Sequence, residues 1–429
     1  MKLHPFFKFP ILLIIPSFFC FPFEFAFLPG INTKMALAAL GLALLVVRSA
    51  TNRRASLDRD FFVLTIFAII VSLVGLTSVV FNNTTDYSYA SYIVSFFVWM
   101  GGAYFVTSSI SFLHGKISPL IVINYLISIC VVQCVLALLI SRNPLVKDFV
   151  DSFLGGNGFM GKMDNRMYGI GCALDVAGLK FSCVLVAISF VVMNGLCKSN
   201  FRTYVYWIAY LFVAVVGNMI GRTTSVGVVV SVFYMIVHCL YNGDSGYLKS
   251  RIFPLVLMIT VLLPILVFLY NNNPQTREDL RFGFEGFFSL AETGKWETNS
   301  NNRLQDMFIL PDNPKTWIIG DGYFDNPYTD PYYNGDNPTE YYKGTDVGYL
   351  RFIYYFGIIG LISFVVFFFE AFWNCASRHR QYAMLFLLLL LVNYIVWFKV
   401  SSDIFLIFAL FFCVPAESEE GSEQNVMEK

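Results

Sequence analysis

The sequence predicts an all-α integral membrane protein that crosses the bilayer many times. Of its 429 residues, 57% are hydrophobic and 18% aromatic, and only 14% carry a charge, against about 25% in soluble proteins. Long apolar runs recur along the chain without the short alternating segments of a membrane β-barrel. This composition excludes a soluble enzyme, a disordered scaffold and a disulfide-stapled secreted protein.

Charge and cysteine content exclude further classes. Lysine plus arginine and aspartate plus glutamate both total 29, so the chain has no basic field and we expect no nucleic-acid partner. Six of the nine cysteines lie inside apolar runs, no CxxC motif occurs, and the four histidines are far apart. We therefore expect neither a metal site nor a cofactor.

A bilayer core about 30 Å thick requires about 20 apolar residues in a helix. Twelve runs meet or approach that length, and we predict about twelve transmembrane helices. The runs at 31–47 and 400–414 are short, so eleven is the alternative count. The first run contains three prolines and lacks a small-residue cleavage site, which favours a retained span over a signal peptide. The runs are 6–28, 31–47, 61–81, 91–113, 118–141, 178–196, 203–221, 223–241, 252–270, 347–370, 382–398 and 400–414.

Lysine and arginine in the short connections predict the orientation. With the N-terminus inside, the short inner connections hold eleven of them and the short outer connections only three, namely Lys34, Arg222 and Lys399. Both termini are therefore predicted to be cytoplasmic. The acidic segment 415–429 is interpreted as a solvated tail.

The predicted spans divide the chain into four parts. Residues 1–270 carry spans one to nine, including a long outer connection at 142–177. Residues 271–346 form a large outer loop between spans nine and ten, and 347–414 carry spans ten to twelve. A loop of this size held by a rigid scaffold is a typical place for function. The chain shows no internal repeat and no nucleotide-binding fingerprint.

Four arginines fall on the predicted outer side: Arg166, Arg222, Arg303 and Arg351. One interpretation is that these arginines have no specific ligand and that their side chains simply reach lipid head groups or water. The other is that they converge on an anion, because a guanidinium binds phosphate oxygens in a bidentate way and stays charged. A lipid diphosphate at that depth would be the natural ligand. Both interpretations remain open for each residue.

The segment before the tenth span is rich in tyrosine and aspartate, with six Tyr and five Asp between positions 321 and 346. Polar-tipped aromatic rings beside carboxylates suit sugars, so Tyr323, Tyr328 and Tyr349 are candidate sugar-binding residues. A flexible surface loop is the alternative. Residues 334–337 lack the ligand spacing of a calcium loop. Asp346 is either a catalytic base or positioning group, or a cap for the tenth span.

Several motifs together resemble a known family. They are Asn301-Asn302-Arg303-Leu304, Trp317-Ile318-Ile319-Gly320-Asp321-Gly322, Thr345-Asp346-Val347-Gly348-Tyr349-Leu350, Phe356-Gly357-Ile358-Ile359-Gly360-Leu361 and Arg222-Thr223-Thr224-Ser225. By the order of these motifs along the chain and by the loop sizes, residues 118–370 resemble the Wzy-type O-antigen and capsular polysaccharide polymerases. The O-antigen ligases share this layout.

The resemblance implies a multi-pass glycosyltransferase of the cell inner membrane, with its site facing the periplasm and with no metal or cofactor. It implies joining of undecaprenyl-diphosphate-linked oligosaccharides, as donor and acceptor, into O-antigen or capsular polysaccharide. By the resemblance, Arg222 and Arg303, with Arg166, would hold diphosphate. From its place on the outer side, Arg351 is a further candidate for binding diphosphate, and we expect Asp346 to act beside Arg222 and Arg303 in catalysis. Membrane lipid, a chain-length regulator and a flippase are the further expected partners.

Two alternatives remain open. Ligases of this superfamily resemble the chain but carry a histidine where Asp346 stands, and none of the four histidines falls on the predicted outer side. A lipid-linked oligosaccharide flippase can also have about twelve spans. Transporters, however, place polar groups near the bilayer midplane at broken helices, whereas the polar candidates here gather on one side. A polymerase is therefore the favoured prediction.

Overall fold

The computed structural model describes residues 5–51, 58–154, 166–197, 199–242, 245–326 and 341–416. These residues form α-helices and short 3-10 turns, and within them β-structure is limited to isolated bridges. Nine of the described helices are long and apolar enough to cross a bilayer. The predicted class, an all-α polytopic membrane protein, is confirmed.

The nine helices coincide with nine of the predicted spans. The other three predicted spans correspond to helices of 16, 14 and 8 residues, α1 (Pro5–Cys20), α18 (Ala383–Val396) and α19 (Phe405–Phe412). At 1.5 Å per residue these are shorter than the bilayer core. The count of twelve and the inside–outside assignment therefore stay predictions. The nine long helices are α2 (Thr33–Thr51), α3 (Arg59–Asn82), α4 (Tyr92–His114), α5 (Pro119–Arg142), α8 (Leu174–Met193), α9 (Asn200–Ile220), α10 (Thr224–Asn242), α12 (Phe253–Asn272) and α17 (Gly348–Arg378).

Both long connections contain helices of their own. The connection at 142–177 carries α6 (Pro144–Phe153). The larger one at 271–346 carries α13 (Pro274–Gly283), α14 (Glu285–Thr293), α15 (Asn299–Asp306), α16 (Pro314–Ile318) and the 3-10 turn η1 (Tyr342–Gly344). Two short elements complete the set, α11 (Ser245–Arg251) before α12 and η2 (Arg380–Tyr382) before α18.

The chain divides into two compact units. Unit 1 comprises residues 1–34 and 113–297, and unit 2 comprises residues 35–112 and 298–429. The boundary falls inside the predicted loop 271–346, so that α13 and α14 belong to unit 1, whereas α15 and α16 belong to unit 2. Each unit is built from segments far apart in the sequence.

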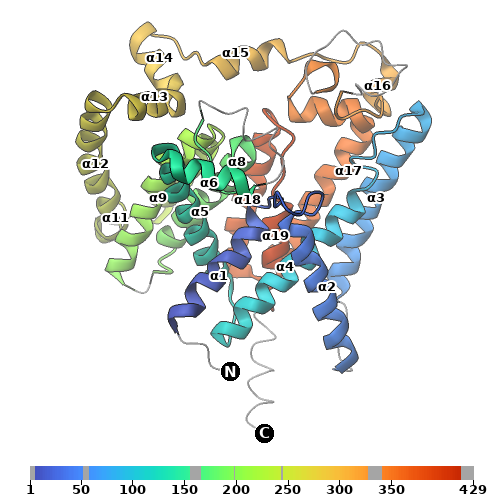
Figure 1. Cartoon of the computed structure of the whole chain (residues 1–429), viewed down its shortest axis with the longest axis horizontal. Helices are drawn as coiled ribbons and strands as arrows, with labels where there is room; N and C mark the ends of the chain where they lie inside the picture. Colours follow the sequence, from blue (N-terminus) through green and yellow to red (C-terminus); the bar gives the residue numbers. More distant parts are fainter. Residues whose placement is uncertain are drawn as a thin grey trace. The chain divides into compact units, whose positions relative to one another are not determined.

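Helix α8 is the core of unit 1, in the green part of the chain in Figure 1. Its apolar window is 94% buried, and α5, α9 and α10 pack around it. Small residues allow α8 to pack closely against α10 and the turn that precedes it. A Cβ on Gly227 would lie 2.2 Å from Ser182 Cα, and a Cβ on Gly178 would lie 2.9 Å from the carbonyl oxygen of Gly221. Such small-residue contacts are typical of helices packed inside a membrane.

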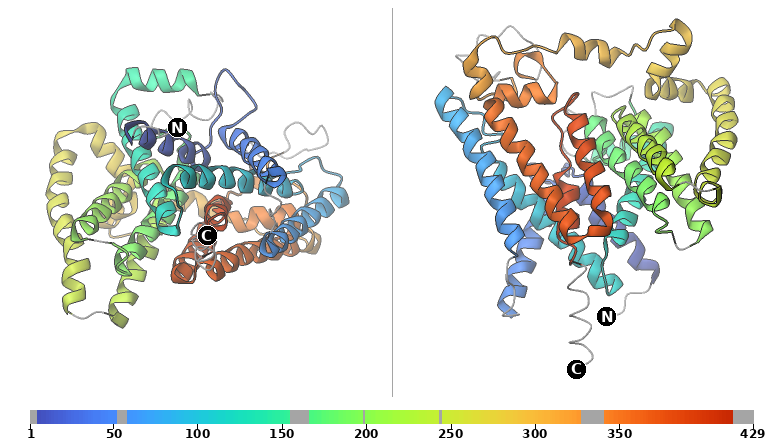
Figure 2. Two further views of the ribbon diagram at one scale, coloured as in Figure 1. Left: turned by 90° about the horizontal axis from the view of Figure 1, so that it is seen from below. Right: turned by 180° about the vertical axis from the view of Figure 1, so that it is seen from behind.

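In unit 2, the 31-residue helix α17 runs alongside α3, and Figure 2 shows the two ribbons next to each other. Helix α17 is broken at Phe356 and Gly357, where Gly357 adopts φ +68° and ψ −172°. This conformation is essentially restricted to glycine. The break leaves backbone carbonyls without their helical partners, which is tolerated at membrane depth only when protein groups or water satisfy them.

The loop after α16 supplies those partners. The backbone amide of Asp321 donates to the carbonyl of Tyr354 at 2.6 Å, and the amide of Gly322 donates to the carbonyl of Tyr355 at 3.0 Å. The hydroxyl of Ser78 on α3 donates to the same Tyr355 carbonyl at 2.6 Å. Two of the motifs recognised in the sequence, 317–322 and 356–361, therefore meet at this break.

Candidate functional site

The first candidate cluster lies in unit 1, where α9 turns into α10. Arg222 is held in a tight turn, because the amide of Gly221 donates to the Gly217 carbonyl at 2.8 Å and the Thr224 hydroxyl donates to the Gly221 carbonyl at 2.7 Å. The neighbouring hydroxyl of Thr223 donates to the carboxylate of Asp175 at the start of α8. The turn thus presents the Arg222 side chain at the end of the helix bundle.

Arg222 meets the helices of the large connection. Its guanidinium forms an ion pair with Glu285 at the start of α14 and lies 4.7 Å from the ring centroid of Phe282 on α13. The Arg222 and Glu285 side chains are 16% and 25% exposed. Partial burial of this kind strengthens charge interactions compared with a fully solvated surface pair.

Arg166 lies on the same aromatic ring. Its guanidinium carbon is 5.1 Å from the centroid of Phe282, so Arg166 and Arg222 both make a cation–π contact with this one ring. The structure finds no carboxylate partner for Arg166 among the described residues. Two guanidinium groups therefore lie on one ring, and guanidinium groups are well suited to bind an anion.

Helix α13 is fixed against the end of α5. The guanidinium of Arg142 donates to Asp279 at 2.8 Å and to the Thr276 hydroxyl at 3.0 Å, and Gln275 donates to the Ser141 carbonyl at 2.7 Å. Burial raises the pKa of the Asp279 carboxyl above its ordinary value, while Arg142 opposes that rise. These contacts hold the Phe282 ring in place for the two arginines.

The second candidate cluster lies in unit 2 around Arg351, which is only 7% exposed. Its guanidinium lies 3.7 Å from the ring centroid of Phe324 and 4.5 Å from that of Tyr341. It donates to Asp325 at 2.6 Å, to the Phe324 carbonyl at 3.1 Å and to the Ser401 hydroxyl at 3.1 Å. With so many protein partners, Arg351 is better suited to positioning its neighbours than to binding diphosphate.

Asp346 belongs to the Arg351 cluster. Its carboxylate lies 3.7 Å from a guanidinium nitrogen of Arg351, and its side chain is 24% exposed. The N-cap position of α17 is occupied by Val347, the following residue. Asp346 thus faces Arg351 while keeping part of its surface accessible, and its catalytic role stays a prediction.

The remaining predicted site residues are dispersed over unit 2. Arg303 is exposed on α15. The ring of Tyr323 lies 5.4 Å from that of Tyr342, centroid to centroid. Tyr349 donates its hydroxyl to the Tyr394 carbonyl at 2.9 Å. Tyr328 lies outside the described residues. The convergence of Arg303 with Arg222 stays a prediction, since the two residues belong to different units.

The described histidines are engaged elsewhere. His114 contacts the Tyr125 hydroxyl at 2.6 Å, and His238 contacts the Tyr247 hydroxyl at 2.6 Å, in both cases at the opposite ends of the unit 1 helices from Arg222. His379 is buried after α17 in unit 2, and His4 is not among the described residues. In the part of the chain that the structure describes, no group of three potential ligands could hold a metal.

Sequence reasoning missed Phe282 and Glu285, which complete the Arg166–Arg222 cluster. The segment around them contains closely spaced aromatic residues next to acidic ones. Such residues can contact arginines, but this pattern alone is a weak signal. It also missed Asp325 and Tyr341, which flank Arg351. Their proximity depends on long-range packing, so spacing in the sequence carried no sign of it.

No family model, curated protein or solved structure matches this chain. The likeness to the Wzy-type polymerases therefore rests on the motifs, and the activity it implies is a proposal.

Proposed function

We propose that the protein is a polysaccharide polymerase that joins lipid-diphosphate-linked oligosaccharides, with Arg166 and Arg222 binding the diphosphate of the donor. The single observation that carries this proposal is the pair of guanidinium groups on the Phe282 ring, at 5.1 and 4.7 Å. Two adjacent guanidinium forks match the several oxygens of a diphosphate. The membrane-embedded character of the chain suits a lipid-linked substrate.

In the proposed reaction, a hydroxyl oxygen of the acceptor sugar attacks the anomeric carbon at the reducing end of the growing chain. The bond from that carbon to the phosphate oxygen breaks, and the lipid diphosphate departs with the electron pair. Arg166 and Arg222 stabilise the charge that develops on the departing group. The hydroxyl proton passes to a carboxylate, for which Asp346 is the candidate.

Arg303 and Asp346 enter this proposal through the motifs in which they occur. In the structure Asp346 is held beside Arg351 at 3.7 Å, an ion pair that orients the carboxylate. Arg351 is thereby assigned a positioning role. Among the described residues, Tyr323 and Tyr349 remain the candidates for contact with sugar. The site is proposed to face the periplasm.

The test is polymer formation in a host that lacks its own polymerase, at matched protein levels. Arg222→Ala, Arg303→Ala and Asp346→Asn are expected to shorten or abolish the polymer. Arg281→Ala is the matched control, because Arg281 lies on the same helix as Phe282 but is half-exposed and paired with Glu292. Normal chain lengths in all three site variants would refute the site.

A flippase for lipid-linked oligosaccharides is the second candidate, and the break in α17 at Gly357 favours it, since transporters often place substrates at broken helices. Here, however, the freed carbonyls of Tyr354 and Tyr355 accept hydrogen bonds from Asp321, Gly322 and Ser78. Deletion of the gene separates the two functions. Loss of a polymerase leaves outward-facing single repeats, whereas loss of a flippase leaves inward-facing ones.

A further inference from the structure

Helix α6 has three distinct faces. Val150 is 5% exposed, and with Val146 it packs into a buried cluster. Lys147, Asp148, Asp151 and Ser152 form the polar face. The third face is apolar yet exposed, with Leu145 at 79%, Phe149 at 70% and Phe153 at 37%. These three residues are four positions apart, so they form one row along the helix.

The exposed row is part of a larger aromatic surface in unit 1. The ring of Phe25 lies 5.1 Å from that of Phe153 and 5.0 Å from that of Phe27, centroid to centroid. The amide of Ala26 donates to the Phe153 carbonyl at 3.0 Å, which ties the two segments together. Phe27 is 73% exposed. We call the exposed side chains of Phe27, Leu145, Phe149 and Phe153 the α6 surface.

The α6 surface lies at the end of a membrane span. Asn143 is the only residue between α5 and α6, and its side chain accepts a hydrogen bond from the Leu145 amide at 3.0 Å. The backbone is extended at Asn143, and Figure 1 shows α6 lying across the end of α5 rather than continuing it. The helix therefore begins where the apolar span ends.

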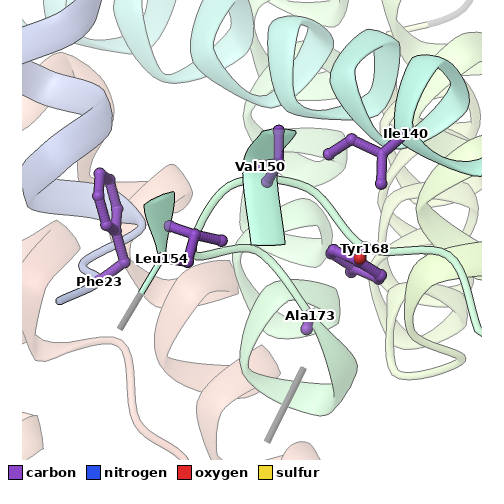
Figure 3. Close-up of a cluster of buried hydrophobic side chains, with 6 residues drawn as sticks. All are labelled: Phe23, Ile140, Val150, Leu154, Tyr168 and Ala173. Carbon is purple, nitrogen blue, oxygen red and sulfur yellow. The ribbon is translucent and has the colours of Figure 1, made fainter. Parts of the chain in front are cut away.

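Contacts below α6 fix its orientation. Figure 3 shows Val150 and Leu154 packed with Phe23, Ile140 and Tyr168. The Tyr168 hydroxyl donates to Asp151 at 2.7 Å on the polar side of the helix. Since one flank is bound to the protein and the polar residues lie on another, the row of Leu145, Phe149 and Phe153 is left facing outward.

We propose that α6 is an interfacial helix, whose α6 surface inserts between the acyl chains of one membrane leaflet. A helix with an apolar row and an opposed charged face lies in the plane of the interface, and large aromatic side chains are favoured at that depth. An exposed apolar surface of this kind is rare on the water-facing part of a protein. Its continuity with the span α5 identifies lipid as the occupant.

The insertion has a consequence for the Arg166–Arg222 cluster, and this step rests on the proposed function. Arg166 is two residues from Tyr168, whose hydroxyl donates a hydrogen bond to Asp151 on α6. Anchoring α6 in the interface therefore holds Arg166 at the depth of lipid phosphates. The donor's diphosphate would then reach the arginines without leaving the head-group layer.

The test places the photoreactive residue p-benzoylphenylalanine at position 149 or at position 148 of the full chain, reconstituted in phosphatidylethanolamine–phosphatidylglycerol vesicles. Both positions are exposed, so each variant is expected to fold, and they differ by about 100° around the helix. After irradiation, mass spectrometry measures lipid adducts. A several-fold excess of adduct at 149 over 148 is expected.

Equal lipid adducts at the two positions, or no adduct at 149, would overturn the proposal. A cross-link from 149 to a second copy of the chain, in place of lipid, would overturn it as well and assign the surface to an oligomer. Cross-linking needs no catalytic activity, so the outcome is independent of the polymer assay. Arg222→Ala can therefore abolish polymer while the lipid adduct at 149 persists, which separates the two proposals.

Discussion

Arg222 and Glu285 form an ion pair that joins the turn between α9 and α10 to the start of α14, across 63 positions of sequence. Glu285 therefore occupies part of the guanidinium surface that an incoming anion would use. A carboxylate and a phosphate oxygen are both acceptors for the same donor fork. Binding of a diphosphate at Arg222 thus requires Glu285 to be displaced.

We predict that Glu285→Gln tightens the binding of inorganic pyrophosphate to the purified protein by about fivefold, equivalent to roughly 1 kcal/mol for a partly exposed ion pair. The reason is that glutamine removes the competing charge but keeps the shape. Isothermal titration calorimetry measures the change. Glu292→Gln is the matched control, because Glu292 pairs with Arg281 at an exposed position. Weaker binding in Glu285→Gln would contradict the prediction.

A second prediction concerns Phe282, whose ring is shared by two guanidinium groups. Phe282→Leu retains the bulk but removes two cation–π contacts, each contributing about 0.5–1 kcal/mol at a partly exposed site. Pyrophosphate affinity is expected to fall several-fold. Phe287→Leu on α14, where the ring is 60% exposed, serves as the control. Equal effects of the two substitutions would show that the ring platform is irrelevant to anion binding.

The break in α17 leads to a third prediction. Gly357→Ala is expected to lower the free energy of unfolding by more than about 2 kcal/mol, because a side chain is strained at φ +68° and ψ −172°. In addition, the new Cβ would lie 2.1 Å from the carbonyl oxygen of Ile318. Thermal unfolding in detergent measures the change.

Gly294→Ala provides the comparison for that measurement. Gly294 also has a positive φ, +72°, but a Cβ there would meet no atom within 4 Å. Its ψ of 6° places it in the αL region, which other residues adopt at a modest cost, so a loss of about 1 kcal/mol is expected. A similar loss of stability in both variants would contradict the prediction that the backbone conformation of Gly357 and its close contact with Ile318 make it the costlier site.

The Arg351 cluster gives a fourth prediction. Asp346→Asn is expected to lower the melting temperature more than Asp325→Asn, although Asp325 lies closer to Arg351. The Asp325 side chain is 63% exposed, whereas that of Asp346 is 24% exposed, so water screens the former pair more strongly. The reverse order of melting temperatures would contradict this assignment.

Much of the fold could be predicted from the sequence, because the length of an apolar run decides whether a helix can cross a bilayer. Nine long helices follow that rule. Helices α18 and α19 did not, since residues 397–404 between them are not helical. There the amide of Ile404 donates to the Asn393 side chain at 3.2 Å, and the indole of Trp397 donates to the Ser402 carbonyl at 3.0 Å. Hydrogen-bond partners of this kind are invisible in a hydropathy pattern.

The candidate site was predictable to a lesser extent. Arg222 was identified because a charge near an apolar span needs a reason to be there, and Arg166 because it falls on the predicted outer side. Their common neighbour Phe282 was not, because nothing in local spacing indicates which ring lies against a distant guanidinium. The role of Gly357 was hidden for a similar reason. Its motif reads as an ordinary span interior until the carbonyl acceptors of Tyr354 and Tyr355 are seen with their donors.

The bond from Ser78 to the Tyr355 carbonyl has a consequence for biosynthesis. Helix α3 is made early and its partner α17 is made late, with the whole second segment of unit 1 translated between them. Since domains generally assemble as their residues emerge from the ribosome, α3 is made well before the Tyr355 carbonyl to which its Ser78 hydroxyl donates in the finished protein. A nascent chain arrested before α17 would hold a completed unit 1 and an orphaned α3, which marks that stage as the one most exposed to membrane quality control.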